Sequence, residues 1–463
     1  MARTHWVGRV LVFVFLPLAI SMTPASAQTT NEVTNGGTIS SGTTAIITNP
    51  VTSITGAITN DGSLEFWQST SLSNGFVISG AGSVSQRGSG TTILSGANTY
   101  TGGTTNSAGT LSVGSSSALG TGTLTMNGGS LGVAGAGGWT LTNAIVLSAN
   151  SVADTAGGNL TLGGTISGTG SFNKGFNNNT LTIAGTYAAT GDLYTDQGTI
   201  NFTGTQTGGG KVDATANAIF NNTGTLNITN SFTQFAVGGW GGNGTMAVFN
   251  NNGTIYQASG SSFNIGKAGS GTFNQNGGTV TVANTALLSI GLEGNAAVGS
   301  GSGILNLNAG TFTVTSAVPF IYLGGTGSNT TNSTGVINLN GGTFATATRI
   351  SKWVGTNSGT GNSATVNFNG GTLRGTANNM TLLGTDLTAV NIRTNGATVD
   401  VGAGLTNTIS ANLLDGGGNG GLTKMGAGTL VLSGANTYTG ATTVSGGTLT
   451  VNNNGSDTFS DTT

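Results

Sequence analysis

The chain of 463 residues contains 85 glycines, only 5% charged residues and no cysteine. Without cysteine it has neither a disulfide framework nor a thiolate metal site, and its scattered Lys and Arg leave no basic patch of the kind that nucleic-acid binding needs. Because 36% of the residues are apolar, the composition indicates a folded chain and not a disordered low-complexity segment.

The first predicted element is a secretory signal over residues 1–27. Residues 10–20 form an apolar core, and residues 25–27 form a small-residue cleavage site. The core is about half the ~20 residues that span a bilayer, so we expect Sec export and a mature chain that begins at Gln28. Its removal also removes His5, the only histidine, and leaves nine basic and 13 acidic residues, a net charge of −4.

A repeated unit covers most of the residues that follow. It reads Gly-Gly-Thr or a close variant, followed by three further positions. The first of these is apolar, the second is small or polar, and the third is usually apolar. Copies begin at Asn127, Asn276, Asn308, Asn340, Asn369 and Ser445, and those from Asn276 to Asn369 are 32, 32 and 29 residues apart. Short apolar segments precede three of these copies, so each unit within residues 276–375 is predicted to be strand, turn, strand.

The unit predicts β-structure because its residues alternate between two faces. Leu449 and Val451 alternate with Thr448 and Thr450, which is the period of a strand. Thr and Val are β-branched and suit a pleated, half-buried surface. No window outside the signal shows a helical period.

The fold class predicted for residues 28–463 is all-β, a right-handed parallel β-helix forming one elongated rod. Sandwich domains would need polar linkers, and a propeller would repeat an aromatic signature in each blade; the sequence has neither. Asparagines that recur at one place in successive units are expected to stack as an amide ladder. At ~4.8 Å per coil, about 15 to 20 coils would make a rod roughly 70 to 100 Å long.

Two stretches share the nine residues LSGANTYTG, at residues 94–102 and 432–440. The longer segments around them, residues 88–113 and 426–451, resemble the autotransporter-associated β-strand repeat, or passenger-associated transport repeat, of bacterial autotransporter passengers. In the second copy the resemblance places strands at residues 429–432, 442–444 and 448–451. It implies a β-helical passenger displayed on or beyond the outer membrane.

The same resemblance raises the question of anchoring. Autotransporters end in a membrane β-barrel, and residues 452–463 are too few to form one. We therefore expect a barrel or another membrane anchor to be supplied by a missing C-terminal part or by another protein.

Catalysis was considered because β-helix enzymes that cleave polysaccharides use grouped acidic residues. Asp61 with Glu65 and Asp192 with Asp196 are close acidic pairs, and neither pair recurs in other units of the repeat. The mature chain has no His or Cys to serve a nucleophilic triad, and the glycine-rich segment from Asp415 is one copy of a motif that binds calcium only when stacked. We predict no enzyme, no catalytic or metal-binding residues and no cofactor, with a carbohydrate-active β-helix enzyme as the alternative.

Aromatic and threonine residues were weighed as binding groups. Tyr100 and Tyr438 are predicted to pack over a neighbouring coil, although they could be platforms for glycan stacking. The tryptophans are interpreted first as core plugs or anchors of insertions and second as binding residues, and these are Trp67, Trp139, Trp240 and Trp353. Runs of Thr-x-Thr are too irregularly spaced to predict a matched hydroxyl array, and they begin at Thr123, Thr140, Thr180, Thr279, Thr311 and Thr448.

The sequence therefore predicts a secreted or surface-displayed structural or adhesin-like passenger of a Gram-negative bacterium. Its location would be extracellular or associated with the outer membrane. Its uncharged Thr, Ser and Asn exterior suits contact with a surface polysaccharide or another cell, and nucleic acid is not an expected partner.

Overall fold

The structure is a computed structural model. It describes residues 27–29, 33–175, 177–229, 234–238, 246–258, 262–267, 269–283, 287–292, 301–315, 320–325, 333–353 and 361–452. Most of the predicted signal, residues 1–26, therefore lies outside the described residues. The first strand, β1 (Ala27–Thr29), begins one residue before Gln28, the predicted N-terminus of the mature chain. This cleavage boundary stays a prediction.

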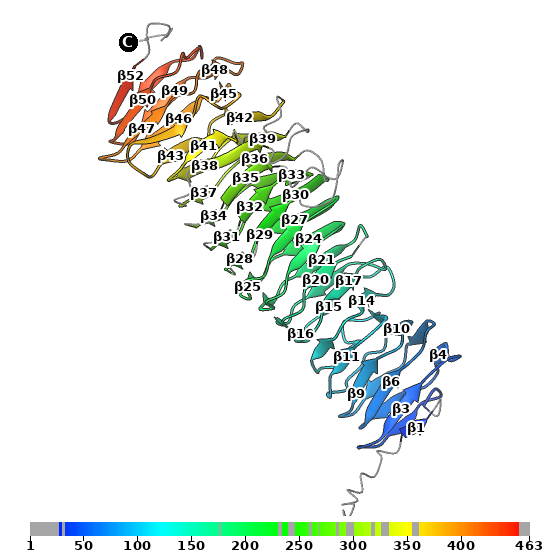
Figure 1. The fold of residues 1–463 in the computed structure, drawn as a ribbon. Helices are drawn as coiled ribbons and strands as arrows, with labels where there is room; N and C mark the ends of the chain where they lie inside the picture. Colours follow the sequence, from blue (N-terminus) through cyan, green and yellow to red (C-terminus); the bar gives the residue numbers. More distant parts are fainter. Residues whose placement is uncertain are drawn as a thin grey trace, which may run out of the picture.

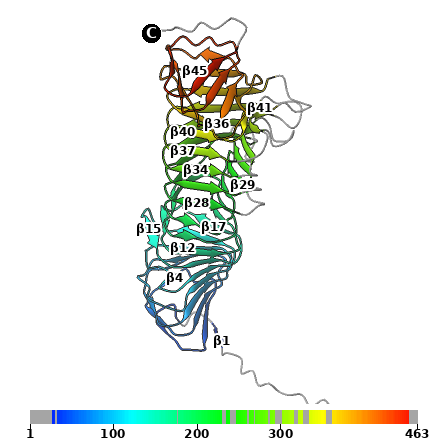
Figure 2. The same cartoon turned by 90° about the vertical axis from the view of Figure 1, so that its left-hand side faces the viewer.

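The described residues form an elongated rod built only from β-strands (Figures 1 and 2). The described part of the chain holds no helix long and apolar enough to cross a bilayer. The chain visits three sheets in turn and then starts the next coil, and each strand pairs in parallel with the equivalent strand of the next coil. The predicted parallel β-helix is confirmed, and its right-handed sense stays a prediction.

The three sheets run along the rod as open ladders. Sheet 1 has 19 strands, from β1 to β51 (Thr442–Val444), and sheet 2 runs from β4 (Ser53–Ile54) to β52 (Thr448–Val451). Near the N-terminus the third face is a short sheet of β2 (Gly37–Ile39), β5 (Ile58–Asn60) and β8 (Ile78–Ser79). Sheet 3 takes this position afterwards, with the strands β15 (Trp139–Leu141), β18 (Leu160–Leu162), β21 (Thr180–Ile183), β24 (Gly198–Phe202), β27 (Ala218–Asn222), β30 (Met246–Asn251), β33 (Ser270–Gln275), β36 (Ser302–Leu307), β39 (Thr334–Leu339), β42 (Ser363–Phe368), β45 (Ala389–Ile392) and β48 (Leu413–Asp415).

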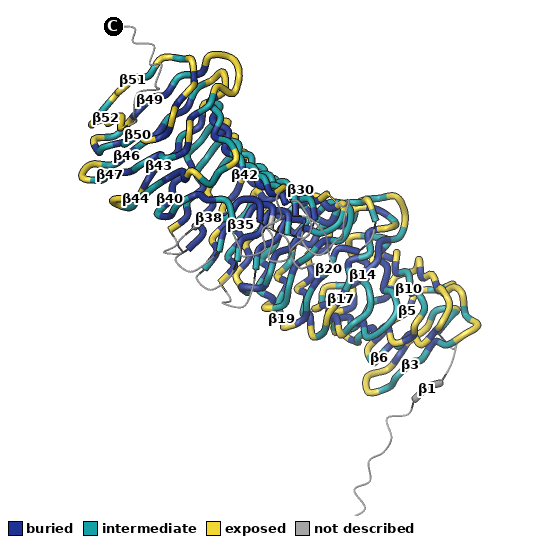
Figure 3. The backbone as a smooth tube through the Cα atoms, turned by 45° about the horizontal axis from the view of Figure 1, so that its top comes forward, coloured by how far each residue is buried: buried dark blue, intermediate teal, exposed yellow. Residues whose placement is uncertain are grey.

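The core is a column of apolar side chains enclosed by the three sheets. Figure 3 shows that buried residues recur along the whole rod. On sheet 3, Phe220, Phe249 and Phe273 stack from coil to coil, with ring centroids 4.8 and 5.2 Å apart and planes within 8°. Offset aromatic stacking of this kind adds about 1 kcal/mol per pair beyond the burial of apolar area. Alternation along the strand therefore fixes which side chains enter the core, as the sequence predicted.

Buried polar side chains occupy the inner side of the corners. Asn222 donates to Asn251 Oδ1 at 2.7 Å, and Asn251 donates to Gln275 Oε1 at 2.8 Å. Lys424 is fully buried and its Nζ donates to the carbonyl oxygens of Met425, Gly426 and Gly446 at 2.7 to 3.0 Å. The three contacts of Lys424 satisfy backbone carbonyls that the sheet ladders leave unpaired where the chain turns.

One corner, between sheet 3 and sheet 1, explains much of the glycine content. Gly253, Gly278 and Gly310 occupy the same place in successive coils, and a Cβ on Gly253 or Gly278 would lie 2.1 Å from the carbonyl oxygen of the glycine one coil before. No heavier residue fits without moving backbone, so glycine is required there by close approach of the coils.

Candidate interaction surface

A single row of threonines runs along the outside of sheet 1. It spans eleven successive strands, and each threonine is the register partner of the next. None of the row's hydroxyls makes a side-chain hydrogen bond to another described residue. The row comprises Thr186 in β22 (Thr186–Tyr187), Thr205 in β25 (Thr205–Gln206), Thr225 in β28 (Thr225–Ile228), Thr254 in β31 (Thr254–Gln257), Thr279 in β34 (Thr279–Val282), Thr311 in β37 (Thr311–Val314), Thr343 in β40 (Thr343–Thr346), Thr372 in β43 (Thr372–Gly375), Thr398 in β46 (Ala397–Val401), Thr423 in β49 (Leu422–Met425) and Thr443 in β51.

The sequence did not predict this single row, because the expectation of no matched array concerned the Thr-x-Thr runs. Coils differ in length because segments are inserted at other corners, so irregular sequence spacing still gives regular stacking on sheet 1. The Thr-x-Thr runs themselves do not form one array, since Thr140 and Thr180 lie on sheet 3 and Thr448 on sheet 2. The next outward row on sheet 1 is mixed, with Tyr256, Thr281, Thr313, Ala345 and Arg374 in register.

The predicted amide ladder is confirmed on sheet 3. Each asparagine Nδ2 donates to the Oδ1 of the asparagine one coil before, at 2.7 to 2.9 Å. The ladder comprises Asn201, Asn221, Asn250, Asn274, Asn306, Asn338, Asn367 and Asn391. Seven hydrogen bonds in one direction thus tie eight coils together on the outer surface.

A second, exposed ladder follows at the corner itself. Asn308 donates to Asn276 Oδ1 at 2.8 Å, and Asn340 donates to Asn308 Oδ1 at 2.9 Å. Asn369, the next copy in the sequence, instead accepts from the backbone N–H of Asn395 at 3.3 Å. The repeat predicted from Asn276 to Asn340 therefore stacks, and its fourth member has another partner.

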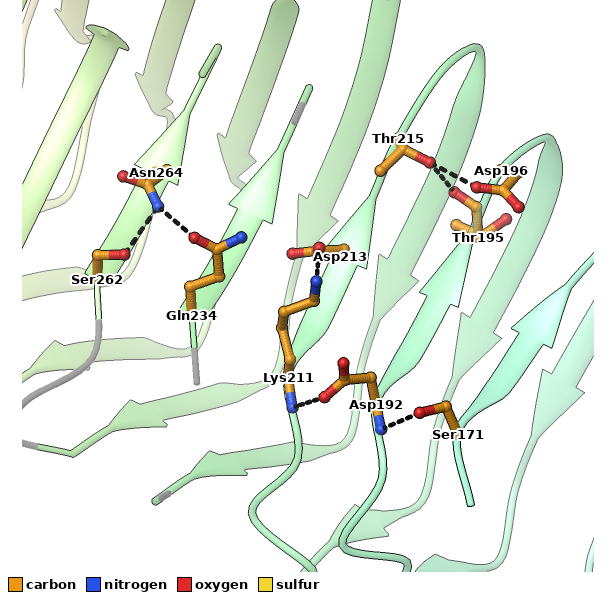
Figure 4. A network of polar contacts seen from close by, with 10 residues as sticks. All are labelled: Ser171, Asp192, Thr195, Asp196, Lys211, Asp213, Thr215, Gln234, Ser262 and Asn264. Atoms are coloured by element: carbon orange, nitrogen blue, oxygen red, sulfur yellow. Dashed lines mark hydrogen bonds and ion pairs between the residues drawn. The ribbon is translucent and has the colours of Figure 1, made fainter. Parts of the chain in front are cut away.

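Asp192 and Asp196, the candidate catalytic pair, lie at opposite ends of β23 (Leu193–Thr195) and have separate partners (Figure 4). Asp192 Oδ1 accepts from the backbone N–H of Lys211 at 3.1 Å. Asp196 accepts from Asn173 Nδ2 at 2.7 Å and from Thr215 Oγ1 at 2.9 Å. Their carboxylates thus serve as acceptors that link neighbouring coils.

The sequence missed a buried ion pair in the same region, between Lys211 Nζ and Asp213 Oδ2 at 2.7 Å. Burial raises the pKa of Asp213 to about 6, and the neighbouring Lys211 opposes this rise. Asp213 lies in β26 (Val212–Ala214), beside Tyr194 of β23 (Leu193–Thr195) in the register of sheet 2. Lys211 and Asp213 are two residues apart, and the two-residue period of an extended chain places such side chains on one face, so this spacing is the signal that could have found the pair.

Asp61 and Glu65 also have separate partners. Asp61 Oδ1 accepts from the N–H of Ala81 at 3.0 Å. Glu65 contacts Arg87 Nε at 3.0 Å and accepts from Trp67 Nε1 at 2.8 Å. The interpretation of Trp67 as a core plug is wrong, since the side chain lies on the surface with 50% of its area exposed.

The other tryptophans differ from one another. Trp139 is half-buried and donates to the carbonyl of Ala134 at 3.0 Å. Trp353 is half-buried and meets Tyr322 edge-on, with ring centroids 4.5 Å apart. Trp240 lies outside the described residues. The contacts of Trp139 and Trp353 agree with the anchoring role that was one part of the first interpretation.

Tyr100 and Tyr438 lie inside the rod, so the packing interpretation is confirmed. They are 0% and 4% exposed, and their hydroxyls lie 2.6 and 2.5 Å from Thr104 Oγ1 and Thr442 Oγ1. Burial raises the pKa of Tyr100 well above its usual range. Neither ring is available to stack on a glycan.

The described residues gather no three His, Cys, Asp or Glu side chains into a possible metal site. Asp415 accepts from the N–H of Gly417 at 2.8 Å, which is a local turn contact. Among the candidate groups, the exposed hydroxyl and amide rows are therefore the features most suited to contact a partner.

A family model for the passenger-associated-transport repeat matches residues 84–113 and 422–451. The chain carries two passenger-associated-transport repeats. Each match begins four residues before the stretch predicted from the sequence, and the predicted strands of the second copy agree with β50 (Thr429–Leu432), β51 and β52.

A curated protein that is similar to part of this chain is the adhesin BmaC autotransporter of Brucella suis biovar 1 (strain 1330). It is 47% identical to this chain over 76 residues, which are 16% of this chain and 2% of that protein. The likeness thus spans a small share of both proteins. No solved structure shows a significant match to the chain.

Proposed function

We propose that this protein is a non-enzymatic, surface-displayed or secreted rod that acts as an adhesin-like passenger of a Gram-negative bacterium. The observation that carries the proposal is the pair of passenger repeats near the two ends of one continuous β-solenoid. The predicted signal over residues 1–27 supports Sec export, and the printed name of the relative supports adhesion.

The surface chemistry supports contact with a surface polysaccharide or another cell. Charged side chains neutralise one another in pairs, as in Glu65 with Arg87 and Arg374 with Asp400. The remaining exterior of sheets 1 and 3 presents hydroxyls and amides in long rows. Such a surface holds no basic patch for nucleic acid among the described residues.

Adhesion of coated particles tests this function. Beads carrying the full chain should bind to cells or to immobilised cell-surface polysaccharide, whereas beads carrying the chain after irreversible heat unfolding should not. An epitope-tagged chain in its native host should be labelled by antibody on intact cells. Labelling only after lysis, together with equal binding by both bead types, would contradict the proposal.

The absence of catalysis is part of the proposal and has its own test. It is supported by the separate engagement of Asp192 and Asp196 and of Asp61 and Glu65 in structural contacts. Incubation with a panel of polysaccharides should release no reducing ends. Depolymerisation that is abolished by Asp192→Asn or Asp61→Asn would favour the alternative, a carbohydrate-active β-helix enzyme.

A further inference from the structure

We propose that one corner of the rod binds a single unbranched, neutral glycan chain that lies parallel to the rod axis. The corner is called the polar track, and it consists of the amide ladder Asn276, Asn308 and Asn340, the hydroxyl row Thr279, Thr311 and Thr343, and the glycines between them, Gly278, Gly310 and Gly342. The inference rests on the proposed function, because it names the ligand class and the place where an adhesin-like rod would bind it.

The track presents free hydrogen-bonding capacity on both sides. An asparagine amide has two N–H donors and an oxygen with two lone pairs, and the ladder uses one of each between neighbours. Asn276, Asn308 and Asn340 are exposed, so their remaining groups face solvent. The hydroxyls of Thr279, Thr311 and Thr343 make no side-chain hydrogen bond to another described residue.

Between the asparagines and the threonines the track carries only glycine and one small side chain, the methyl group of Ala309. Gly278, Gly310 and Gly342 have φ of 61°, 73° and 60°, and each sits directly before a threonine of the row. Amides therefore line one side and hydroxyls the other, with backbone between them. A ligand lying there can accept from and donate to both sides at once.

The repeat of the track extends in one direction only. Asn and Thr recur once per coil, at ~4.8 Å, whereas the next outward row on sheet 1 changes from Thr281 and Thr313 to Ala345 and Arg374. A planar lattice would need further matched rows beyond the threonines on the face of sheet 1. A linear polymer needs only the amide row and the hydroxyl row of the track, so the geometry favours a single chain running along the rod.

The charge of the track selects among linear polymers. None of its nine residues is charged, and the first charged side chain of the adjacent row, Arg374, is paired with Asp400 at 3.4 Å. No cation is present to replace the counterions of an anionic glycan or a nucleic acid. The methyl group of Ala309 is too small an apolar group to anchor a peptide, so a hydroxyl-rich neutral chain is the complementary ligand.

Isosteric removal of the hydroxyls tests the inference. In the triple variant Thr279→Val, Thr311→Val and Thr343→Val, the β-branched shape is kept and three donors and acceptors are lost. The matched control is Thr140→Val, Thr161→Val and Thr182→Val, a row in three successive coils on sheet 3. Affinity electrophoresis of the full chain would use cello-oligosaccharides, linear dextran and, as the anionic comparison, polygalacturonate.

We expect a neutral glycan to bind the wild type and the control alike and the track variant about tenfold or more weakly. Thr311→Arg, which lays a long side chain over the track, should have the same effect even if the triple variant folds poorly. Binding of polygalacturonate alone, equal losses in both triple variants, or no binding by any of the glycans would overturn the inference. Bead adhesion to cells that persists in those cases would leave the proposed function standing, and its loss would remove both.

Discussion

The first passenger repeat lies between neighbouring coils, whereas the second forms the last described coils of the rod (Figure 1). Their corners are built alike. Asn98 Oδ1 accepts from the N–H of Ile78 at 2.8 Å, and Asn436 Oδ1 accepts from the N–H of Leu413 at 3.0 Å. The nine shared residues thus bond to the preceding coil in the same way in both places.

Burial, in contrast, differs between the two copies. Leu111 and Val113 are fully buried, while the equivalent Leu449 is half-buried and Val451 is 39% exposed. The first copy is covered by the coil of β14 (Ser130–Val133), and no described coil follows β52. This difference shows that the sequence of the repeat determines its turns and its contact with the preceding coil. The following coil is needed to complete its apolar core.

The largest expected effect comes from truncating the equivalent leucines. Leu111→Ala should lower the free energy of unfolding by about 3 to 5 kcal/mol, because it leaves a cavity in a closed core. Leu449→Ala should cost about 1 kcal/mol, since its side chain is already partly in water. Urea unfolding, followed by circular dichroism, measures both variants.

If the coil after each repeat completes its core, Leu111→Ala and Leu449→Ala must lower the free energy of unfolding by different amounts. Leu64→Ala, which removes a fully buried leucine on sheet 1 between two covered coils, is the control and should match Leu111→Ala. Equal losses in Leu111→Ala and Leu449→Ala would mean that the second repeat is as well covered as the first.

Substitution of an equivalent pair of glycines should, in contrast to the leucines, lower the free energy of unfolding by the same amount in the two repeats. Gly109 and Gly447 have φ of 60° and 66°, and a Cβ on them would lie 2.3 and 2.2 Å from the carbonyl oxygens of Gly90 and Gly428 in the coil before. Gly109→Ala and Gly447→Ala should each cost about 2 to 3 kcal/mol in the same unfolding experiment. A tolerated Gly447→Ala would show that the last coil is loosely held against its neighbour.

The position of Lys424 in the second repeat is occupied by Gln86 in the first. Gln86 Nε2 donates to the carbonyls of Gly88 and Gly90 at 2.8 and 3.2 Å, much as Lys424 Nζ caps its own corner. Lys424→Met should cost about 1 to 2 kcal/mol by leaving carbonyls unpaired, and Lys424→Gln should restore most of this. Equal stability of the Met and Gln variants would exclude the capping role.

Architecture was predictable from the sequence because it depends on local pattern. Alternation in residues 448–451, the Gly-Gly corners and the recurring asparagines were sufficient for strands, turns and a stacked solenoid. Burial of Tyr100 followed from the preference of such rings for packing. These inferences needed only the neighbours in the chain and the assumption that coils stack.

What the sequence could not predict depends on which residues become neighbours across coils. The threonine row escaped notice because its members are 19 to 32 residues apart, with lengths set by insertions at other corners. The burial of Lys424 could not be predicted because a lone lysine is usually solvated. The exposure of Trp67 could not be predicted because an aromatic residue type alone does not indicate whether its side chain points into the core or towards solvent. The pairing of residues between neighbouring coils, and therefore the polar track, can be identified only from the structure.

The smallest expected effect is the pH dependence that distinguishes Lys424 from Gln86. Burial lowers the pKa of Lys424 from 10.5, with Asp400 opposing the change. Between the lowered value and 10.5, the unfolded chain holds a proton that the folded chain has released, so the free energy of unfolding should rise with pH over this window. Unfolding of the wild type and Lys424→Gln at neutral and alkaline pH should show the wild type gaining stability relative to the variant, and parallel pH profiles would mean that the ammonium stays protonated within its carbonyl cage.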